Sequence, residues 1–273
     1  MQMDTFFSMG KSHKVCEDYA LHGKTLPMNI FAISDGCSSS VDTDFGSRIL
    51  LKSLMMAFTD NKERYKSDIK CIWDKAMHVA WALGLDKACL DATMNFGYVV
   101  ENNGVRGIEV ITIGDGFVVA QANSGEFSIM EIDFSQNAPY YLSYEFDNDR
   151  KQQLMKLKQE KHVTVKCYDF QSCAIQDSYT STTPENIAVD KFTRSWFPLE
   201  DYKSVSVFSD GLKTFLPHDQ TQPRVPLEQI VKELISFPQT NGDFVKRRCL
   251  KFMKNHVESS FYDDFSMATL VRD

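Results

Sequence analysis

Apolar residues recur at two different spacings in the first third of the chain. Near 4–8, 17–22 and 28–34 they form short runs, which are typical of strands. Between 43 and 84 they recur every three or four positions, which predicts two helices. The first helix would carry Leu50, Leu51, Leu54, Met55 and Phe58, and the second Tyr65, Ile69, Ile72, Trp73, Ala76 and Ala80.

Four more strand-like runs follow the helices, at 91–101, 105–113, 116–122 and 126–133. An Asn-Asn-Gly sequence separates the first two runs and an Asn-Ser-Gly sequence separates the last two, and both are typical of hairpin turns. Hairpins indicate antiparallel pairing, because parallel strands need long crossover connections.

The region 135–200 has a weaker pattern. Its charged stretch at 147–161 predicts a helix with a solvated face, and the polar stretch QDSYTSTTPEN predicts a mobile surface loop. A strand at 203–209, helices near 226–236 and 243–257, and a last strand at 264–272 complete the chain. This order of elements predicts an α+β fold or a layered sandwich rather than a doubly wound parallel sheet.

Composition narrows the class of protein. The 273 residues suffice for one large domain or two small ones, and 43% hydrophobic with 25% charged residues is ordinary for a globular protein. The net charge of −7, without any Lys/Arg run, argues against a nucleic-acid partner. No run approaches the roughly 18 apolar residues of a membrane helix, and the N-terminus does not resemble a secretory signal. We expect a cytoplasmic protein without a membrane partner.

The seven cysteines do not suggest a covalent framework. Their number is odd and no Cys-x-x-Cys pair occurs, which argues against disulfides and against a structural zinc site. Reduced thiols in a cytoplasm fit this pattern best.

Acidic residues recur where apolar strands meet loops. One apolar run leads into Ser-Asp-Gly at 34–36, and a second leads into the same tripeptide at 209–211. The other such acids are Glu17, Asp18, Asp115, Asp263 and Asp264. Glycine beside an acid lets the backbone turn sharply and leaves its carbonyl accessible.

Carboxylates and carbonyls without His or Cys partners are the ligands of hard cations such as Mg²⁺ or Mn²⁺. Several unpaired acids in one cleft would repel one another and raise their pKa values, a cost that divalent cations remove. A single Asp-Gly is more often a turn. The residues alone therefore leave open whether these acids form turns or one metal centre.

The order of the motifs adds to this reading. Five short motifs follow one another along the chain: CEDYA, FAISDGCSSS, TIGDG, VFSDGL and YDDFSMATL. In the order of these motifs the chain resembles the metal-dependent protein phosphatases of type 2C (the PPM family). The resemblance extends nearly from end to end, is weakest over 135–200, and is closest to compact bacterial-type members. It implies one phosphatase domain over 1–273 with a divergent flap-like segment within about 135–200.

The resemblance implies a fold and a ligand set. The fold would be an αββα sandwich of two antiparallel β-sheets flanked by pairs of helices. Two Mg²⁺ or Mn²⁺ ions would share Asp35, with Gly36 giving its carbonyl to one ion and Asp210 and Asp263 holding the other. Glu17 and Asp18 would act mostly through water. Asp115 matches a residue that helps to hold a third ion in some relatives.

The implied activity is that of a phosphoserine and phosphothreonine protein phosphatase in signalling, with a cognate kinase as a possible partner. A metal-activated water, positioned through Asp35 and Asp210, would attack phosphorus, so that no nucleophilic Cys or Ser is required. Residues 171–195 lie where relatives carry a flap beside the active site, and we expect them to gate substrate access.

Three departures from the family pattern put full activity in doubt. His13, flanked by Lys11 and Lys14, stands where relatives carry a phosphate-binding Arg, so it is either a phosphate contact or a local hydrogen-bonding residue. Cys37 follows the first Asp-Gly, where some relatives have a His. Thr214 replaces the Asp of three-metal relatives, which makes a third ion doubtful.

These departures motivate an alternative function. The chain could be a catalytically weak type 2C-like protein that binds a phosphoprotein and regulates it. A third possibility is another hard-cation hydrolase, such as a small-molecule phosphatase or a nuclease, although the acidic net charge argues against a nuclease.

Overall fold

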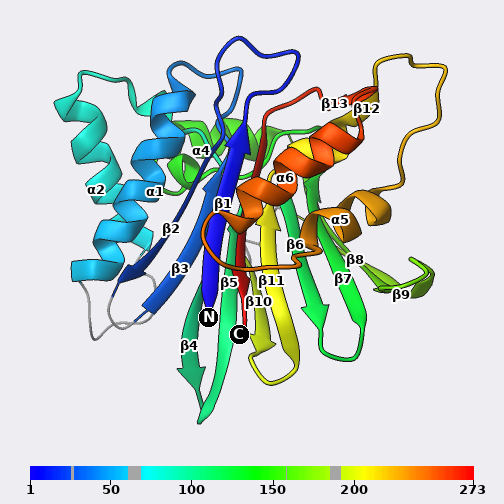
Figure 1. The fold of residues 1–273 in the computed structure, drawn as a ribbon. Coiled ribbons are helices and arrows are strands. Elements are labelled where there is room, and N and C mark those ends of the chain that lie inside the picture. Colours follow the sequence, from blue (N-terminus) through cyan, green and yellow to red (C-terminus); the bar gives the residue numbers. More distant parts are fainter. Residues whose placement is uncertain (26–27, 61–68, 158, 185–191) are drawn as a thin grey trace.

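Two antiparallel sheets pack face to face, and a pair of helices covers the outer side of each (Figure 1). This arrangement comes from a computed structural model, which describes residues 1–273 except 26–27, 61–68, 158 and 185–191. The α+β class and the αββα sandwich are therefore confirmed. None of the described helices is long and apolar enough to cross a membrane.

The larger sheet has seven strands. In spatial order they are β1 (Gln2–Ser8), β14 (Phe265–Val271), β11 (Tyr202–Phe208), β6 (Gly116–Ala122), β7 (Glu126–Phe134), β8 (Glu160–Asp169) and β9 (Ile175–Pro184). The chain's first and last strands are paired neighbours in this sheet, with Gln2 opposite Val271 and Ser8 opposite Phe265.

The smaller sheet has five strands. In spatial order they are β10 (Phe192–Pro198), β5 (Val105–Ile113), β4 (Met94–Asn102), β3 (Met28–Ser34) and β2 (Tyr19–Thr25). A separate short pair joins β12 (Phe215–Pro217) to β13 (Ser259–Phe261).

The helices lie outside the sheets. They are α1 (Thr43–Asp60), α2 (Ile69–Ala82), α3 (Leu142–Phe146), α4 (Asn148–Lys156), α5 (Leu227–Ile235) and α6 (Phe244–Asn255), with 3₁₀ turns η1 (Lys87–Leu90) and η2 (Asp210–Thr214). Helices α1 and α2 pack on the smaller sheet, and α5 and α6 pack on the larger one.

Strand β3 shows why the two-layer core follows from the sequence. Successive side chains of a strand point to opposite faces of the sheet. Ile30 and Ala32 pack beneath α1 and α2, whereas Phe31 and Ile33 join the core between the sheets. Since both faces are covered, all four residues are fully buried and the strand is a continuous apolar run.

The structure corrects two expectations for the region 135–200. The polar stretch expected as a loop forms β9, which pairs along its length with β8. The helix expected over 147–161 is confirmed as α4 over Asn148–Lys156, but it ends five residues earlier than expected, because the chain turns into β8 at Glu160. Tyr65, expected on the second helix, and 185–191, expected within the gating segment, lie outside the described residues.

Candidate metal centre

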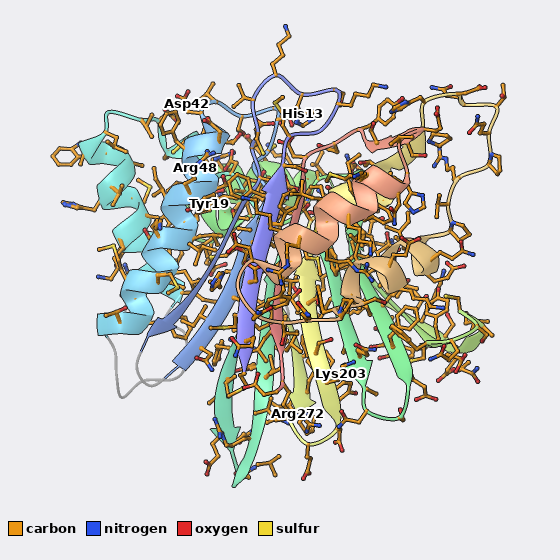
Figure 2. The ribbon with its side chains drawn as sticks, in the orientation of Figure 1. His13, Tyr19, Asp42, Arg48, Lys203 and Arg272 are labelled. Carbon is orange, nitrogen blue, oxygen red and sulfur yellow. The ribbon has the colours of Figure 1, made fainter. Side chains whose placement is uncertain are left out.

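The strand ends that carry acids meet at one end of the sandwich. In the smaller sheet, Tyr19 pairs with Ser34, which places Asp18 and Asp35 side by side at neighbouring strand ends. In the larger sheet, Phe208 pairs with both Phe117 and Met267, which brings the residues around Asp115, Asp210 and Asp263 to the same end. His13 lies at this end of the molecule, and Lys203 and Arg272 lie at the opposite end (Figure 2).

Asp35 lies at the middle of this acidic group. Its carboxyl group is within hydrogen-bonding range of both Asp18 and Asp210, one from each sheet. Burial raises the pKa of Asp35 well above its ordinary value, and the negative charges of Asp18, Asp210 and Asp115 raise it further. Burial likewise raises the pKa of Asp18 to about 7.

Asp115 and Asp210 extend the group into the larger sheet. Burial and the charge of Asp210 raise the pKa of Asp115 to about 7, and burial also raises the pKa of Asp210. Lys213 is the cation beside them, with its Nζ 3.6 Å from Asp133 Oδ1. Burial alone would lower the pKa of Lys213, but the charges of Asp210, Asp133 and Asp115 raise it.

Asp263 lies at the rim of the group, with 42% of its side chain exposed. Its charge raises the pKa of Asp210, so the two acids lie close enough to interact. The Thr214 hydroxyl donates to the Gly211 carbonyl at 2.8 Å and accepts from the Asp263 backbone N–H at 3.0 Å. Thr214 therefore joins the two acidic loops and sets the position of Asp263.

Glu17 faces the loop after β3. Its carboxylate accepts hydrogen bonds from Ser38 Oγ at 2.6 Å and Thr43 Oγ1 at 2.7 Å. Gly36 lies against it, and a Cβ atom at Gly36 would come within 2.8 Å of the Thr43 Cβ and 3.1 Å of the Glu17 Cβ. Only glycine fits there. The same holds at Gly211, where a Cβ atom would lie 1.8 Å from the Asp264 carbonyl oxygen.

Asp264 is a buried carboxylate that the motifs did not single out as a site residue. It accepts backbone N–H groups from Gly10 at 2.7 Å and Glu17 at 2.6 Å, and it lies 3.2 Å from His13 Nδ1. It thereby ties the loop before β2 to the start of β14. The adjacent pair of acids before the last strand was the only sequence signal for it.

His13 lies between acids rather than free at the surface. Its Nε2 is 3.1 Å from Asp263 Oδ1, and its Nδ1 faces Asp264 and, at 3.9 Å, Glu17. Burial alone would lower the pKa of His13, but the neighbouring charges of Asp264, Asp263 and Glu17 outweigh it and raise the pKa. His13, Glu17 and Asp264 also form a compact group with the ligand spacing of a metal site.

Three residues from the region 135–200, which resembles the family least, reach the surroundings of the site: Tyr141, Ser143 and Arg150. Asp91, fully buried, binds Arg150 of α4 through both oxygens, and Ser143 Oγ donates to it at 2.6 Å. Asp91 also accepts from Ser40 Oγ at 2.7 Å, which fixes the loop after Asp35. Burial raises the pKa of Tyr141, and its hydroxyl faces Cys37 near Asp35 and Asp115.

The residues present fit hard cations. Both oxygens of Asp18 are shielded from solvent and lack a hydrogen-bond partner of normal geometry, although Ser209 and Ser266 lie beside the carboxylate. Two ionised carboxylates cannot hydrogen-bond each other, so Asp18 and Asp35 need a shared proton or a cation between them. The donors around them are oxygens, which Mg²⁺ and Mn²⁺ prefer.

The structure thus brings the sequence-predicted residues to one place. Five acids are near enough for their charges to shift the pKa values of neighbours in the group: Asp18, Asp35, Asp115, Asp210 and Asp263. Gly36 and Glu17 adjoin this group at the loop after β3. Metal ligation by these residues stays a prediction.

Comparison with known proteins gives the family. Residues 8–254 match the sequence profile described as protein phosphatase 2C. The chain belongs to the protein phosphatase 2C family. This family is metal-dependent in general, using Mg²⁺ or Mn²⁺. The match ends before Asp263 and Asp264, so the family profile does not cover these two acids. No curated protein is similar enough in sequence to count as a relative.

Solved phosphatases share the fold at low identity. A crystal structure of a bacterial serine phosphatase has a TM-score of 0.56 and 13% identity, covering 100% of this chain and 98% of that one. The serine/threonine phosphatase Stp1 from Staphylococcus aureus has a TM-score of 0.54 and 14% identity, covering 100% and 96%. At these identities the likeness concerns the fold of this protein phosphatase 2C member.

Proposed function

We propose that this protein is a Mg²⁺- or Mn²⁺-dependent phosphatase of phosphoserine and phosphothreonine proteins. The observation that carries the proposal is that Asp35 lies within hydrogen-bonding range of one carboxylate from each sheet, in an acidic group whose members Asp18 and Asp115 are buried. Such a group needs protons or cations to offset its charge, which supports a metal centre in a family that is metal-dependent in general.

Two ions would be held by Asp35, Asp210, Asp263 and the Gly36 carbonyl. Glu17 and Asp18 would lie beside them. Divalent cations held there would activate water for attack on phosphorus and offset the negative charge of the phosphoryl oxygens. Thr214 stands where three-metal relatives have an acid, and its hydroxyl is occupied by Gly211 and Asp263. The site therefore supports two ions better than three.

The chain's own residues shape access to this centre. Asp18 and Asp115 are buried in the sandwich and Asp35 is partly exposed, whereas 42% of the Asp263 side chain is exposed at the rim. A phosphate ester would therefore approach from the side of Asp263 and His13. Lys213 contributes a fixed positive charge beside Asp115 and Asp210, and so offsets part of the negative charge that a phosphate would meet.

The proposed substrates are phosphorylated Ser and Thr residues of proteins, with a cognate kinase acting on the same targets in a cytoplasmic signalling circuit. Gating of the site by residues 171–195 remains a prediction of this proposal. No nucleic-acid or membrane partner is proposed.

The activity test uses a phosphothreonine peptide and the full chain freed of metal with EDTA. We expect no phosphate release from the metal-free protein, release after addition of Mn²⁺, and a loss of at least about 100-fold in Asp35→Asn. Asp74→Asn makes the same change on an exposed face of α2 and should keep full activity. Turnover that survives EDTA, or that persists in Asp35→Asn, contradicts the proposal.

One observation favours the alternative of a catalytically weak regulator. His13, at the place of the family's phosphate-binding Arg, is engaged by Asp263 and Asp264 and has little capacity left for a phosphate. Calorimetric titration with Mn²⁺ separates the two functions. Metal binding without peptide hydrolysis supports the regulator, and hydrolysis at a rate typical of protein phosphatases excludes it.

A further inference from the structure

Helix α6 concentrates positive charge in an acidic protein. Its twelve residues, FVKRRCLKFMKN, contain five Lys or Arg residues and no acid, although the whole chain has a net charge of −7. The helix turns Val245, Cys249 and Phe252 toward the larger sheet. Its basic residues therefore lie on the sides that the fold does not need for packing.

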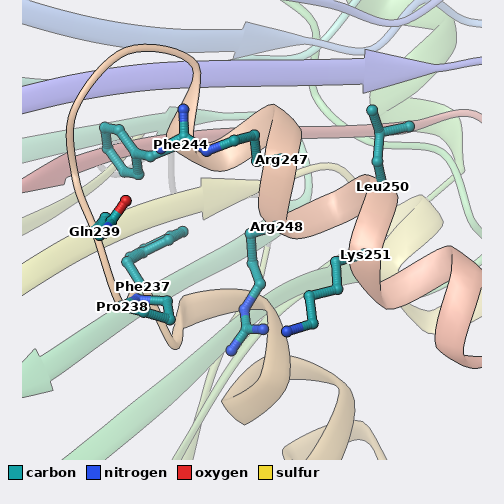
Figure 3. Close-up of a pocket in the computed structure, with 8 residues that line it drawn as sticks. All are labelled: Phe237, Pro238, Gln239, Phe244, Arg247, Arg248, Leu250 and Lys251. Atoms are coloured by element: carbon teal, nitrogen blue, oxygen red, sulfur yellow. The ribbon is translucent and has the colours of Figure 1, made fainter.

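Three of these cations line a pocket beside the α5–α6 connection. The pocket has a volume of about 470 Å³, within the range of ligand sites. Its basic lining residues are Arg247, Arg248 and Lys251, and its apolar ones include Phe237, Phe244 and Leu250. The ends of Arg248 and Lys251 converge beside Phe237 and Pro238, whereas Arg247 turns toward Gln239 and Phe244 (Figure 3).

The cations of this pocket form no close ion pair within the described part of the chain. No carboxylate there lies within 4.0 Å of Arg247, Arg248 or Lys251, and Arg247 donates to the Asn241 carbonyl at 2.7 Å. The Arg248 Nε is shielded from solvent and has no hydrogen-bond partner. Burial lowers the pKa of Arg248, although the charge of Glu233 opposes this effect. A guanidinium keeps its charge, so a buried donor is left unsatisfied.

The aromatic part of the pocket lining is recessed, whereas Leu250, which also lines the pocket, is 49% exposed. Phe244 is 2% exposed and packs edge-on against Phe237 at a centroid distance of 5.0 Å. A membrane surface needs apolar side chains that protrude, whereas a recessed aromatic floor suits a side chain that enters from a partner. Carboxylates match the paired cations, because charge-assisted hydrogen bonds to guanidinium and ammonium groups are strong.

We propose that this pocket binds an acidic segment of a partner protein, with carboxylates on Arg248 and Lys251 and an apolar side chain against Phe237. The site involves none of the acidic residues at the strand ends. It would therefore recruit a partner or substrate independently of hydrolysis, and its test does not depend on phosphatase activity.

The test is fluorescence anisotropy with the full chain and a fluorescein-labelled peptide of alternating Glu and Phe. We expect saturable binding that weakens with salt, and no binding of peptides in which Gln replaces Glu or Ser replaces Phe. Arg248→Gln and Lys251→Gln should each weaken binding by about tenfold. Lys251 is exposed, so its variant reports on the pocket even if Arg248→Gln perturbs folding.

The matched controls are Lys246→Gln and Lys254→Gln, which remove the same charge from α6 outside the pocket. We expect them to change affinity by less than about twofold. Equal losses in pocket and control variants would show general attraction by the helix and overturn the proposal. The absence of peptide binding would also overturn the proposal. If the protein then binds phosphatidylserine vesicles, and this binding requires Arg248 and Lys251, the pocket is a membrane site instead.

Discussion

Asp18 and Asp264 are both buried carboxylates at strand ends, and their surroundings distinguish two roles. Asp264 accepts two backbone N–H groups and faces His13, so its charge is satisfied by the protein. Asp18 lacks such donors and faces Asp35 instead. A satisfied carboxylate stabilises the fold, and an unsatisfied one beside another acid is available to a cation.

Thr214, which replaces the Asp of three-metal relatives, has a structural role: its hydroxyl joins two loops of the site. Thr214→Val keeps the shape but removes the hydroxyl that joins Gly211 to Asp263. We expect the free energy of unfolding to fall by about 1 kcal/mol and Mn²⁺ affinity to weaken, because Asp263 loses its anchor. Urea unfolding and calorimetry measure the two effects. Thr214→Ser restores the hydroxyl and should restore both values; unchanged Mn²⁺ affinity in Thr214→Val would refute this role.

The sequence predicted the acids that follow apolar runs, because Asp35 and Asp210 each end a strand with the same tripeptide. It could not predict the roles of Asp91 or Tyr141. Asp91 meets Arg150 and Ser143 across more than 50 positions of the chain, in a region whose pattern is weak. Such partners follow from tertiary packing, which no local motif records.

At the scale of elements, α4 supports the loop after β3 although it lies far from it in sequence. Arg150 of α4 and Ser40 of the loop both bind Asp91, and the Cys37 backbone N–H donates to the Asp91 carbonyl at 2.8 Å. The loop that carries Asp35 and Gly36 is therefore held by the divergent region.

Arg150→Met tests this support. It leaves the Asp91 charge buried without a cation, and we expect the free energy of unfolding to fall by about 3 kcal/mol. The double variant Arg150→Met with Asp91→Asn removes that uncompensated charge and should regain much of the loss. Chemical denaturation measures both. A single variant as stable as the original chain would show that the ion pair is dispensable.

Strand β9 shows where element prediction fails. Its residues 175–182 are all exposed, so the strand lacks the apolar alternation that marks β3 or β11. It pairs with β8 through backbone bonds and polar contacts such as Thr164 to Thr180, whose hydroxyl oxygens are 3.1 Å apart. A strand with two solvated faces has the composition of a loop.

For the whole molecule, the raised pKa values predict how stability depends on pH. Burial raises the pKa of Asp18 and Asp115 to about 7, and also raises those of Asp35 and Asp210, whereas the unfolded chain titrates near about 4. Between these values the folded state binds more protons, so its stability falls as pH rises.

We therefore expect the melting temperature of the EDTA-treated protein to decrease between about pH 5 and about pH 8. Mn²⁺ should raise it most at the upper end, where the carboxylates are ionised. Asp115→Asn removes one of these groups and should make the decrease shallower. A melting temperature that rises over this range without metal would contradict the pKa values.

The central claim is that acids from both sheets converge on divalent cations, and anomalous diffraction from Mn²⁺-soaked crystals tests it most directly. We expect two anomalous peaks at the strand ends, each about 2.2 Å from a carboxylate oxygen. Asp35 should coordinate both ions, and Asp210 and Asp263 should coordinate the same one of the two. Crystals that hydrolyse a phosphopeptide but show no Mn²⁺ within reach of Asp35 would contradict the account.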